Sequence, residues 1–119
     1  MFNTVYHSVQ PHIQSNYSKD IAVIFRPQIQ PWHPSSTLCH EAATAVLLLS
    51  PDKFWPFSMA LFQKQIDFFD VNVVNETRNQ TYKRLADVAS SAGVDGEAVL
   101  KMLVVPDKPE GDSYNVGNE

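Results

Sequence analysis

The single cysteine, Cys39, is the side chain best suited to act as a nucleophile, and it lies near the start of a predicted helix. A thiol close to a helix N-terminus can have a lowered pKa, and the thiolate is the reactive form of cysteine. His40 and Glu41 follow it, but consecutive helical residues point to different faces and form no catalytic pair. We therefore expect Cys39 to be a small buried hydrophobic side chain near Ala42 and Val46.

Two histidines, His33 and His40, are candidates for binding a metal ion. A zinc site needs at least a third protein ligand at a usable spacing, and the sequence offers none. Glu41 follows His40, but the second histidine of an H-E-x-x-H motif is missing. Since no nucleophile, base and orienting residue can be proposed together, the sequence predicts no catalytic residue, no cofactor and no metal site.

Aromatic residues are concentrated in one part of the chain, where they could line a ligand pocket: Phe54, Trp55, Phe57, Phe62, Phe68 and Phe69. They recur at helical spacing, which is more typical of side chains that a helix turns toward a hydrophobic core. We interpret them as core residues rather than as a binding site.

Composition and charge limit the class of protein. The chain has 119 residues, of which 44% are hydrophobic, and this suffices for one folded domain. A net charge of −4 without a Lys/Arg cluster argues against nucleic-acid binding. The longest apolar run, residues 42–49, is too short to span a membrane, and residues 1–7 do not resemble a signal peptide. We therefore expect a cytoplasmic protein without a membrane partner.

The N-terminal part is predicted to be a helix followed by a strand. Residues 1–15 carry an apolar stripe at helical spacing, with a kink or early stop at Pro11. After a turn, the β-branched and aromatic run Ile21 to Phe25 is too short for a helix and predicts a strand. A lone strand leaves its backbone groups unpaired, and the only other candidate is the short run 71–74. The strand therefore needs a very small sheet or another molecule.

The rest of the chain is predicted to be helical. Prolines hold the loop after the strand extended, and Ser35 or Ser36 can cap a helix over residues 37–49. The run Ser-Pro-Asp at residues 50–52 is a strong signal for the next helix. It offers a capping serine, a proline at the first helical position and an acidic side chain near the positive end of the helix dipole. The apolar stripe of that helix continues to about residue 69.

Two further helices are predicted near the C-terminus. Thr77 to Gln80 matches a capping box and begins a helix that Gly93 ends. Asp95 caps a last short helix, whose apolar residues are Val99, Leu100 and Leu103. From Pro106 onward the composition indicates a polar tail without a core face.

Three segments of the sequence are similar to a known family. These are residues 25–45 with Pro-Trp-His-Pro-Ser-Ser, residues 53–57 with Lys-Phe-Trp-Pro-Phe, and residues 73–85 with Asn-Glu-Thr-Arg-Asn. Together they resemble a eukaryotic group of DsbA-like thioredoxin-fold proteins, a class that includes kappa-type glutathione transferases. The resemblance implies a thioredoxin fold interrupted by a helical insertion, with residues 36 to about 103 as the insertion and Ile21 to Phe25 as the strand before it.

The resemblance also defines what this chain lacks. No residue matches the family's Cys-Pro-Phe-Ser type motif or its cis-proline, so we expect a chain truncated at both ends. Its fold class is then mainly α, an incomplete α/β fold with one residual strand. The expected parts are a remnant of the thioredoxin core over residues 1–35, the helical insertion over 36–105 and the polar tail over 106–119.

Three functional hypotheses follow. The class chemistry is thiol–disulfide oxidoreduction or glutathione-linked transfer, which we expect this chain to lack unless Cys39 retains it. The alternative is a non-catalytic binding module that self-associates or pairs its exposed strand, Ile21 to Phe25, with a full-length relative. The third is a fragment without a function of its own.

Overall fold

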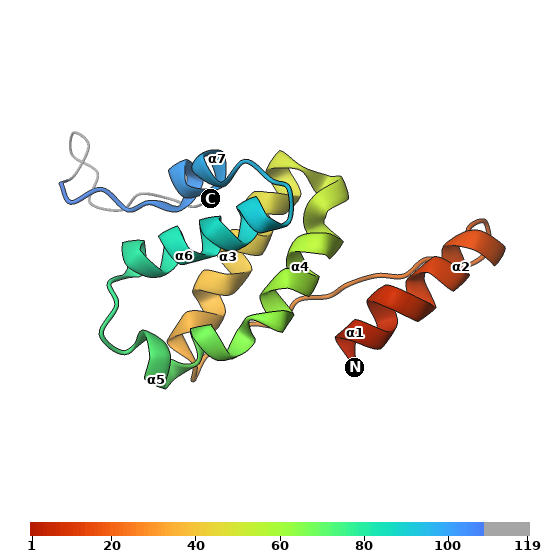
Figure 1. Ribbon diagram of the computed structural model, residues 1–119, viewed down its shortest axis with the longest axis horizontal. Coiled ribbons are helices and arrows are strands. Elements are labelled where there is room, and N and C mark those ends of the chain that lie inside the picture. Colours follow the sequence, from red (N-terminus) through yellow and green to blue (C-terminus); the bar gives the residue numbers. More distant parts are fainter. Residues whose placement is uncertain (109–119) are drawn as a thin grey trace.

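The computed structural model describes residues 1–108 and consists of helices joined by short turns and one long extended segment (Figure 1). The predicted mainly helical class is confirmed. The α-helices are α1 (Phe2–Thr4), α2 (Gln10–Asn16), α3 (Pro34–Leu49), α4 (Phe54–Gln63), α5 (Asp70–Val73), α6 (Arg78–Ser91) and α7 (Gly96–Leu103). A π-helical turn, η1 (Val5–Val9), and two 3₁₀ turns, η2 (Pro51–Lys53) and η3 (Gln65–Phe68), complete the set.

Four helices, α3, α4, α6 and α7, pack into a bundle with one hydrophobic core (Figure 1). Helices α3 and α6 each contact all of the other three, which makes this pair the centre of the bundle. The fully buried side chains of the core with the largest volumes are Tyr82, Phe57, Leu85, Leu103, Val46, Val88 and Val99. Because every helix of the bundle contributes to this list, the core does not depend on the N-terminal residues.

Residues 1–33, here called the N-terminal arm, project from one end of the bundle (Figure 1). α1, η1 and α2 form one continuous helical rod, and the extended segment that follows returns along it and passes α4 to reach the start of α3. The arm stretches the molecule to 53 Å along its longest axis, against 31 Å and 25 Å along the other two. No residue of the rod is fully buried.

Of the kink or early stop predicted at Pro11, the early stop does not occur, because the helix continues through Pro11 to Asn16. Proline has no amide hydrogen and its ring crowds the carbonyl one turn earlier. Here the turn before it is a π-helix, in which the amide of Gln10 donates to the carbonyl of Val5. The wider winding of a π turn is a recognised way to accommodate such a defect within a helix.

The predicted strand Ile21–Phe25 does not form within residues 1–108, and this corrects the sequence-based prediction. The segment is extended, but no strand lies beside it. The reason is that the other candidate strand, residues 71–74, is helical and belongs largely to α5. An extended segment becomes a β-strand only through a hydrogen-bonded neighbour.

The predicted cap of α3 is also wrong. The helix begins at Pro34, with His33 in the N-cap position and proline at the first helical position, where its missing amide hydrogen costs nothing. Neither serine caps the helix. The Ser36 hydroxyl instead accepts a hydrogen bond from the amide of Gln30 (2.9 Å), which fastens the end of the extended segment to α3.

The signals at both ends of α6 and at the start of α7 are confirmed. Thr77 and Gln80 form a reciprocal capping box. After α6, Gly93 has a φ of +82°, and the amides of Gly93 and Val94 donate to the carbonyls of Ser90 and Ala89, which is a Schellman motif. Asp95 then accepts hydrogen bonds from the first amides of α7.

The single helix predicted to continue to about residue 69 is broken at Lys64. The tighter winding of η3 changes which side chains face the bundle, so Phe68 is buried while Ile66 and Phe69 are exposed. The guanidinium group of Arg84 lies 4.9 Å from the centre of the Phe68 ring and donates to the carbonyl of Asp67 (2.7 Å). These contacts hold η3 against α6.

The predicted polar tail, residues 106–119, lies largely outside the described residues. Its start is anchored through Val105, whose amide and carbonyl both bond to the side-chain amide of Asn79 (3.0 and 2.7 Å). Across residues 1–108, every helix is too short or too polar to cross a membrane.

Candidate functional site: the N-terminal arm

Cys39 lies in the first half of α3, partly buried against the hydrophobic core. Burial raises the pKa of its thiol to about 11, because the charged thiolate loses its hydration. The helix N-terminus therefore does not activate this cysteine. At neutral pH the side chain is a neutral thiol in an apolar setting, which is the opposite of a nucleophilic site.

Alkylation should reveal this protonation state. With iodoacetamide at pH 8, we expect Cys39 in the folded protein to react at least about tenfold more slowly than the same cysteine in urea. The rate should rise with pH up to about 11, because the thiolate fraction rises. Mass spectrometry of quenched samples measures the rate of alkylation. A folded protein that reacts faster than the unfolded chain at pH 8 would contradict a buried neutral thiol.

The two histidines take part in separate contacts. His33 Nδ1 lies 2.7 Å from the Asp70 carboxylate, which joins the end of the arm to α5. His40 Nδ1 bonds to the backbone carbonyl of Ser36 (2.7 Å), one turn earlier in α3. Within residues 1–108, no three side chains of metal-ligating type come together. These histidines stabilise local structure.

A polar network that the sequence did not predict connects α3 to α6. The Glu41 carboxylate accepts hydrogen bonds from the guanidinium group of Arg78 (2.7 Å) and from the hydroxyl of Tyr82. Burial, followed by the hydrogen bond to Glu41, raises the pKa of Tyr82 to about 12. Arg78 and Tyr82 are four residues apart on α6, so their contact could have been predicted from the sequence. Glu41 is brought to them only by the tertiary fold. The three groups satisfy one another, which is typical of a structural role.

Five aromatic side chains join the arm to α4 and form what we call the aromatic cluster: Phe2, Phe25, Phe54, Trp55 and Phe62. The Phe2 ring is its centre. It stacks on Phe62 (centroids 4.5 Å apart) and on Trp55 (5.7 Å), and its edge meets Phe25 (5.7 Å). The interpretation of the aromatic series as core therefore holds for Phe57 and Phe68, whereas Phe54, Trp55 and Phe62 hold the arm.

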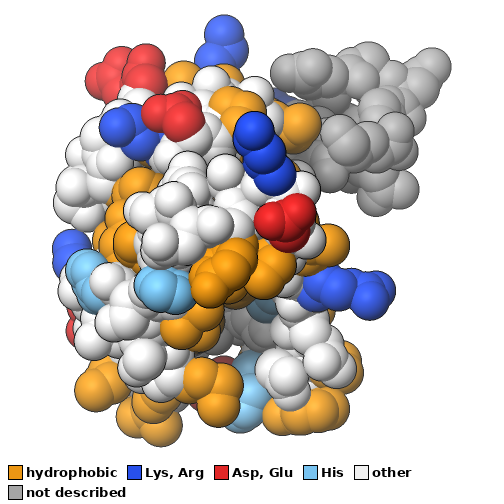
Figure 2. Space-filling view, turned by 90° about the vertical axis from the view of Figure 1, so that its right-hand side faces the viewer, with side chains coloured by type: hydrophobic (Ala, Val, Ile, Leu, Met, Phe, Trp, Pro, Cys, Tyr) orange, Lys and Arg blue, Asp and Glu red, His pale blue; other side chains and the backbone are white. Residues whose placement is uncertain are grey.

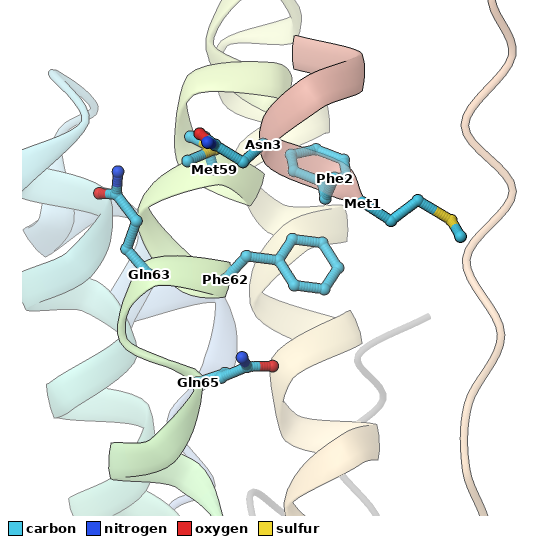
Figure 3. Close-up of a pocket in the computed structure, with 7 residues that line it drawn as sticks. All are labelled: Met1, Phe2, Asn3, Met59, Phe62, Gln63 and Gln65. Atoms are coloured by element: carbon cyan, nitrogen blue, oxygen red, sulfur yellow. The ribbon is translucent and has the colours of Figure 1, made fainter. Parts of the chain in front are cut away.

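An open pocket of about 340 Å³ lies beside the aromatic cluster, between the first residues of the arm and α4 (Figure 3). Its walls combine apolar side chains with amides: Met1, Phe2, Asn3, Met59, Phe62, Gln63 and Gln65. No charged side chain lines it. The space is the gap left where the helical rod meets α4, and none of the side chains that line it is an acid, a base or a nucleophile.

The extended segment of the arm is the most unusual feature of the described chain. From residue 22 to residue 29, the part of the backbone that is described shows no hydrogen bond, whether donated or accepted. Over residues 23–25 the side chains alternate, as in a strand: Val23 and Phe25 are partly buried, whereas Ile24 is 77% exposed. The segment thus presents an extended backbone whose hydrogen-bonding groups have no partner among the described residues.

The face from which the arm projects is rich in apolar atoms. Figure 2 looks onto this end of the molecule and shows hydrophobic side chains in several groups over its middle and lower parts. Exposed apolar side chains of the arm include Val9, Tyr17, Ile21, Ile24, Ile29 and Trp32. Exposed apolar side chains beside unpaired backbone are typical of a surface that binds another chain.

Comparison with known proteins gives no relative, because no family model, curated protein or solved structure matches the chain significantly. The function therefore has to be inferred from the arrangement of the residues.

Proposed function

We propose that this chain is a non-catalytic binding module of the DsbA-like thioredoxin-fold class, and that it docks the segment Ile21–Phe25 as a β-strand onto a partner. The observation that carries the proposal is the extended backbone of residues 22–29, which is free of hydrogen bonds in the described structure. Exposed backbone groups of an extended segment gain hydrogen bonds when a sheet edge accepts them.

The order of elements around the segment supports the same proposal. A helix precedes it, a proline-rich loop follows it, and a helical bundle comes next. This is the order that the resemblance implies for the strand before the helical insertion of a DsbA-like protein. In that fold the strand would have neighbours in a sheet, and here a partner would supply them.

The absence of a catalytic role is supported by Cys39, whose thiol is partly buried and has a raised pKa. Disulfide exchange needs an accessible thiolate, and the class chemistry needs it at the head of a helix. Insulin reduction and glutathione conjugation should therefore proceed at background rates. A rate above background that disappears in Cys39→Ser would overturn this part of the proposal and identify Cys39 as a nucleophile.

Proline substitutions test whether the segment docks as a strand. In a strand, successive amides point to opposite edges, so one edge uses the amide of residue 23 and the other that of residue 24. Proline lacks the amide hydrogen and is tolerated only where that edge faces solvent. For binding to a complete DsbA-like relative, measured by isothermal titration calorimetry, one of Val23→Pro and Ile24→Pro should abolish binding.

The matched control is Gln28→Pro, which places a proline in the same extended segment but beyond the predicted strand. It should bind as the unmodified chain does. Circular dichroism of all three variants reports whether the bundle remains folded. Binding that survives both Val23→Pro and Ile24→Pro would contradict docking through this strand.

A further inference from the structure

We propose that the preferred partner of this strand is a second copy of the same chain, paired antiparallel about Val23. This inference rests on the proposed function, because it names the partner of the same segment. It follows from the order of the residues in Asp20-Ile-Ala-Val-Ile-Phe-Arg26, which is apolar throughout its middle and carries opposite charges at its two ends.

In an antiparallel pair centred on Val23, each residue faces the one at the mirrored position of the other copy. Asp20 then lies opposite Arg26 at both ends of the pair, and Ile21 lies opposite Phe25. Opposite charges that face each other across two strands stabilise the pairing, and an aromatic residue opposite a β-branched one does the same. The two-fold symmetry makes each favourable contact occur twice.

The charges also exclude the competing arrangements. A parallel, in-register pair would place Asp20 against Asp20 and Arg26 against Arg26, and like charges directly opposite each other are destabilising. Shifting the antiparallel register by two residues in either direction leaves both charges without an opposite partner. A shift by one residue would turn the apolar side chains to the wrong face.

The structure leaves these end charges available. Asp20 and Arg26 are both exposed, and within residues 1–108 neither forms a salt bridge. They lie at opposite ends of an extended segment, about 20 Å apart at the usual rise of a strand, so they cannot neutralise each other within one chain. A second copy brings the missing partner to each.

The faces of the segment also suit such a pair. Val23 and Phe25 are both partly buried, and Phe25 packs on Phe2 and Phe54. In the proposed register these side chains meet Val23 and Ile21 of the other copy, so both strands share one apolar face, and Phe25 of each copy links that face to an aromatic cluster. Two strands alone are marginal in water, and packing of one face against other elements is what stabilises them.

Charge reversal in both directions provides the test. Sedimentation equilibrium of the full chain at low salt should show a reversible dimer, with a dissociation constant on the order of 10 μM, as small interfaces give. D20R and R26D should each weaken it by about tenfold or more, because both ends of the pair then bring like charges together. Both positions are exposed, so the circular dichroism spectra should not change.

Restoring the complementarity should restore the dimer. An equimolar mixture of the D20R and R26D chains should form a heterodimer about as strong as the unmodified homodimer, since one copy contributes two positive ends and the other two negative ends. The double variant D20R/R26D should self-associate normally. A simple loss of stability in the single variants would not produce this recovery on mixing.

The outcomes separate this inference from the proposed function. If the chain stays monomeric at all concentrations, or if the mixture does not recover, the second copy is not the partner in this register. Docking on a DsbA-like relative, blocked by a proline in the strand, would then still support the proposed function. Dimerisation that is insensitive to both charge reversals and to both prolines would place the contact elsewhere and overturn the inference.

Discussion

Replacing Phe57 by alanine is expected to lower the free energy of unfolding by about 3–5 kcal/mol, the range found for removing a buried phenylalanine side chain. Phe57 is fully buried and belongs to the same core cluster as Val46, Tyr82 and Leu85. The core cluster takes side chains from four helices. These side chains cannot fill the cavity that alanine would leave unless the helices move relative to one another. Since a domain of this size has about 5–15 kcal/mol in total, the variant should be close to unfolding.

Phe62→Ala is the matched control, because it changes the same residue type in the same helix. Phe62 is 44% exposed and contacts the arm through Phe2 rather than the core of the bundle. Its loss should cost only about 1–2 kcal/mol. Urea unfolding followed by circular dichroism measures both variants. Similar losses for the two would mean that the aromatic cluster and the bundle core form one cooperative unit, contrary to the structure.

These two phenylalanines also show why the sequence predicted only part of the fold. Both fall on the apolar stripe expected to continue to about residue 69, and periodicity alone ranks them equally. The break of α4 at Lys64 and the position of the arm decide which one is buried. Such tertiary choices are not encoded in local spacing.

The signals that were predicted correctly depend on neighbouring residues only. The capping box of Thr77 and Gln80 and the left-handed Gly93 each involve a few consecutive backbone groups, so the sequence pattern is sufficient. The cap of α3 was missed because two signals compete there. The proline at position 34 can occupy the first helical position, and it begins the helix before either serine can serve as its cap.

For the segment proposed to dock, the sequence predicted an extended backbone correctly, but the strand that it also predicted does not form. The composition of Ile21–Phe25 indicates an extended conformation, and the segment is extended. Whether it becomes a strand depends on a neighbour, which no local pattern provides. The network of Glu41, Arg78 and Tyr82 escaped prediction for a similar reason, since Glu41 and Arg78 are 37 positions apart in the sequence.

Hydrogen exchange should show the largest contrast between the two parts of the molecule. The sequence already predicts fast exchange in the first 30 residues and protection over 57–69 and 80–92. With the structure, we expect slow exchange in α3, α4, α6 and α7, and the slowest amides in the buried turns of α6 around Leu85 and Ala89. These should exchange at least about 10³-fold more slowly than in the unfolded chain, because they open only with the whole bundle.

In the dilute, monomeric protein, the amides of residues 22–26 and of 28 and 29 should exchange at nearly the unfolded rate, since no acceptor faces them in the described structure. Raising the protein concentration should protect alternate amides of Ile21–Phe25, because only one edge of a strand meets the second copy. R26D provides the control, as it weakens the pairing without changing the bundle. If the Ile21–Phe25 amides are the slowest to exchange at low concentration, the segment has a partner within the chain, and both the free strand and its docking role would be wrong.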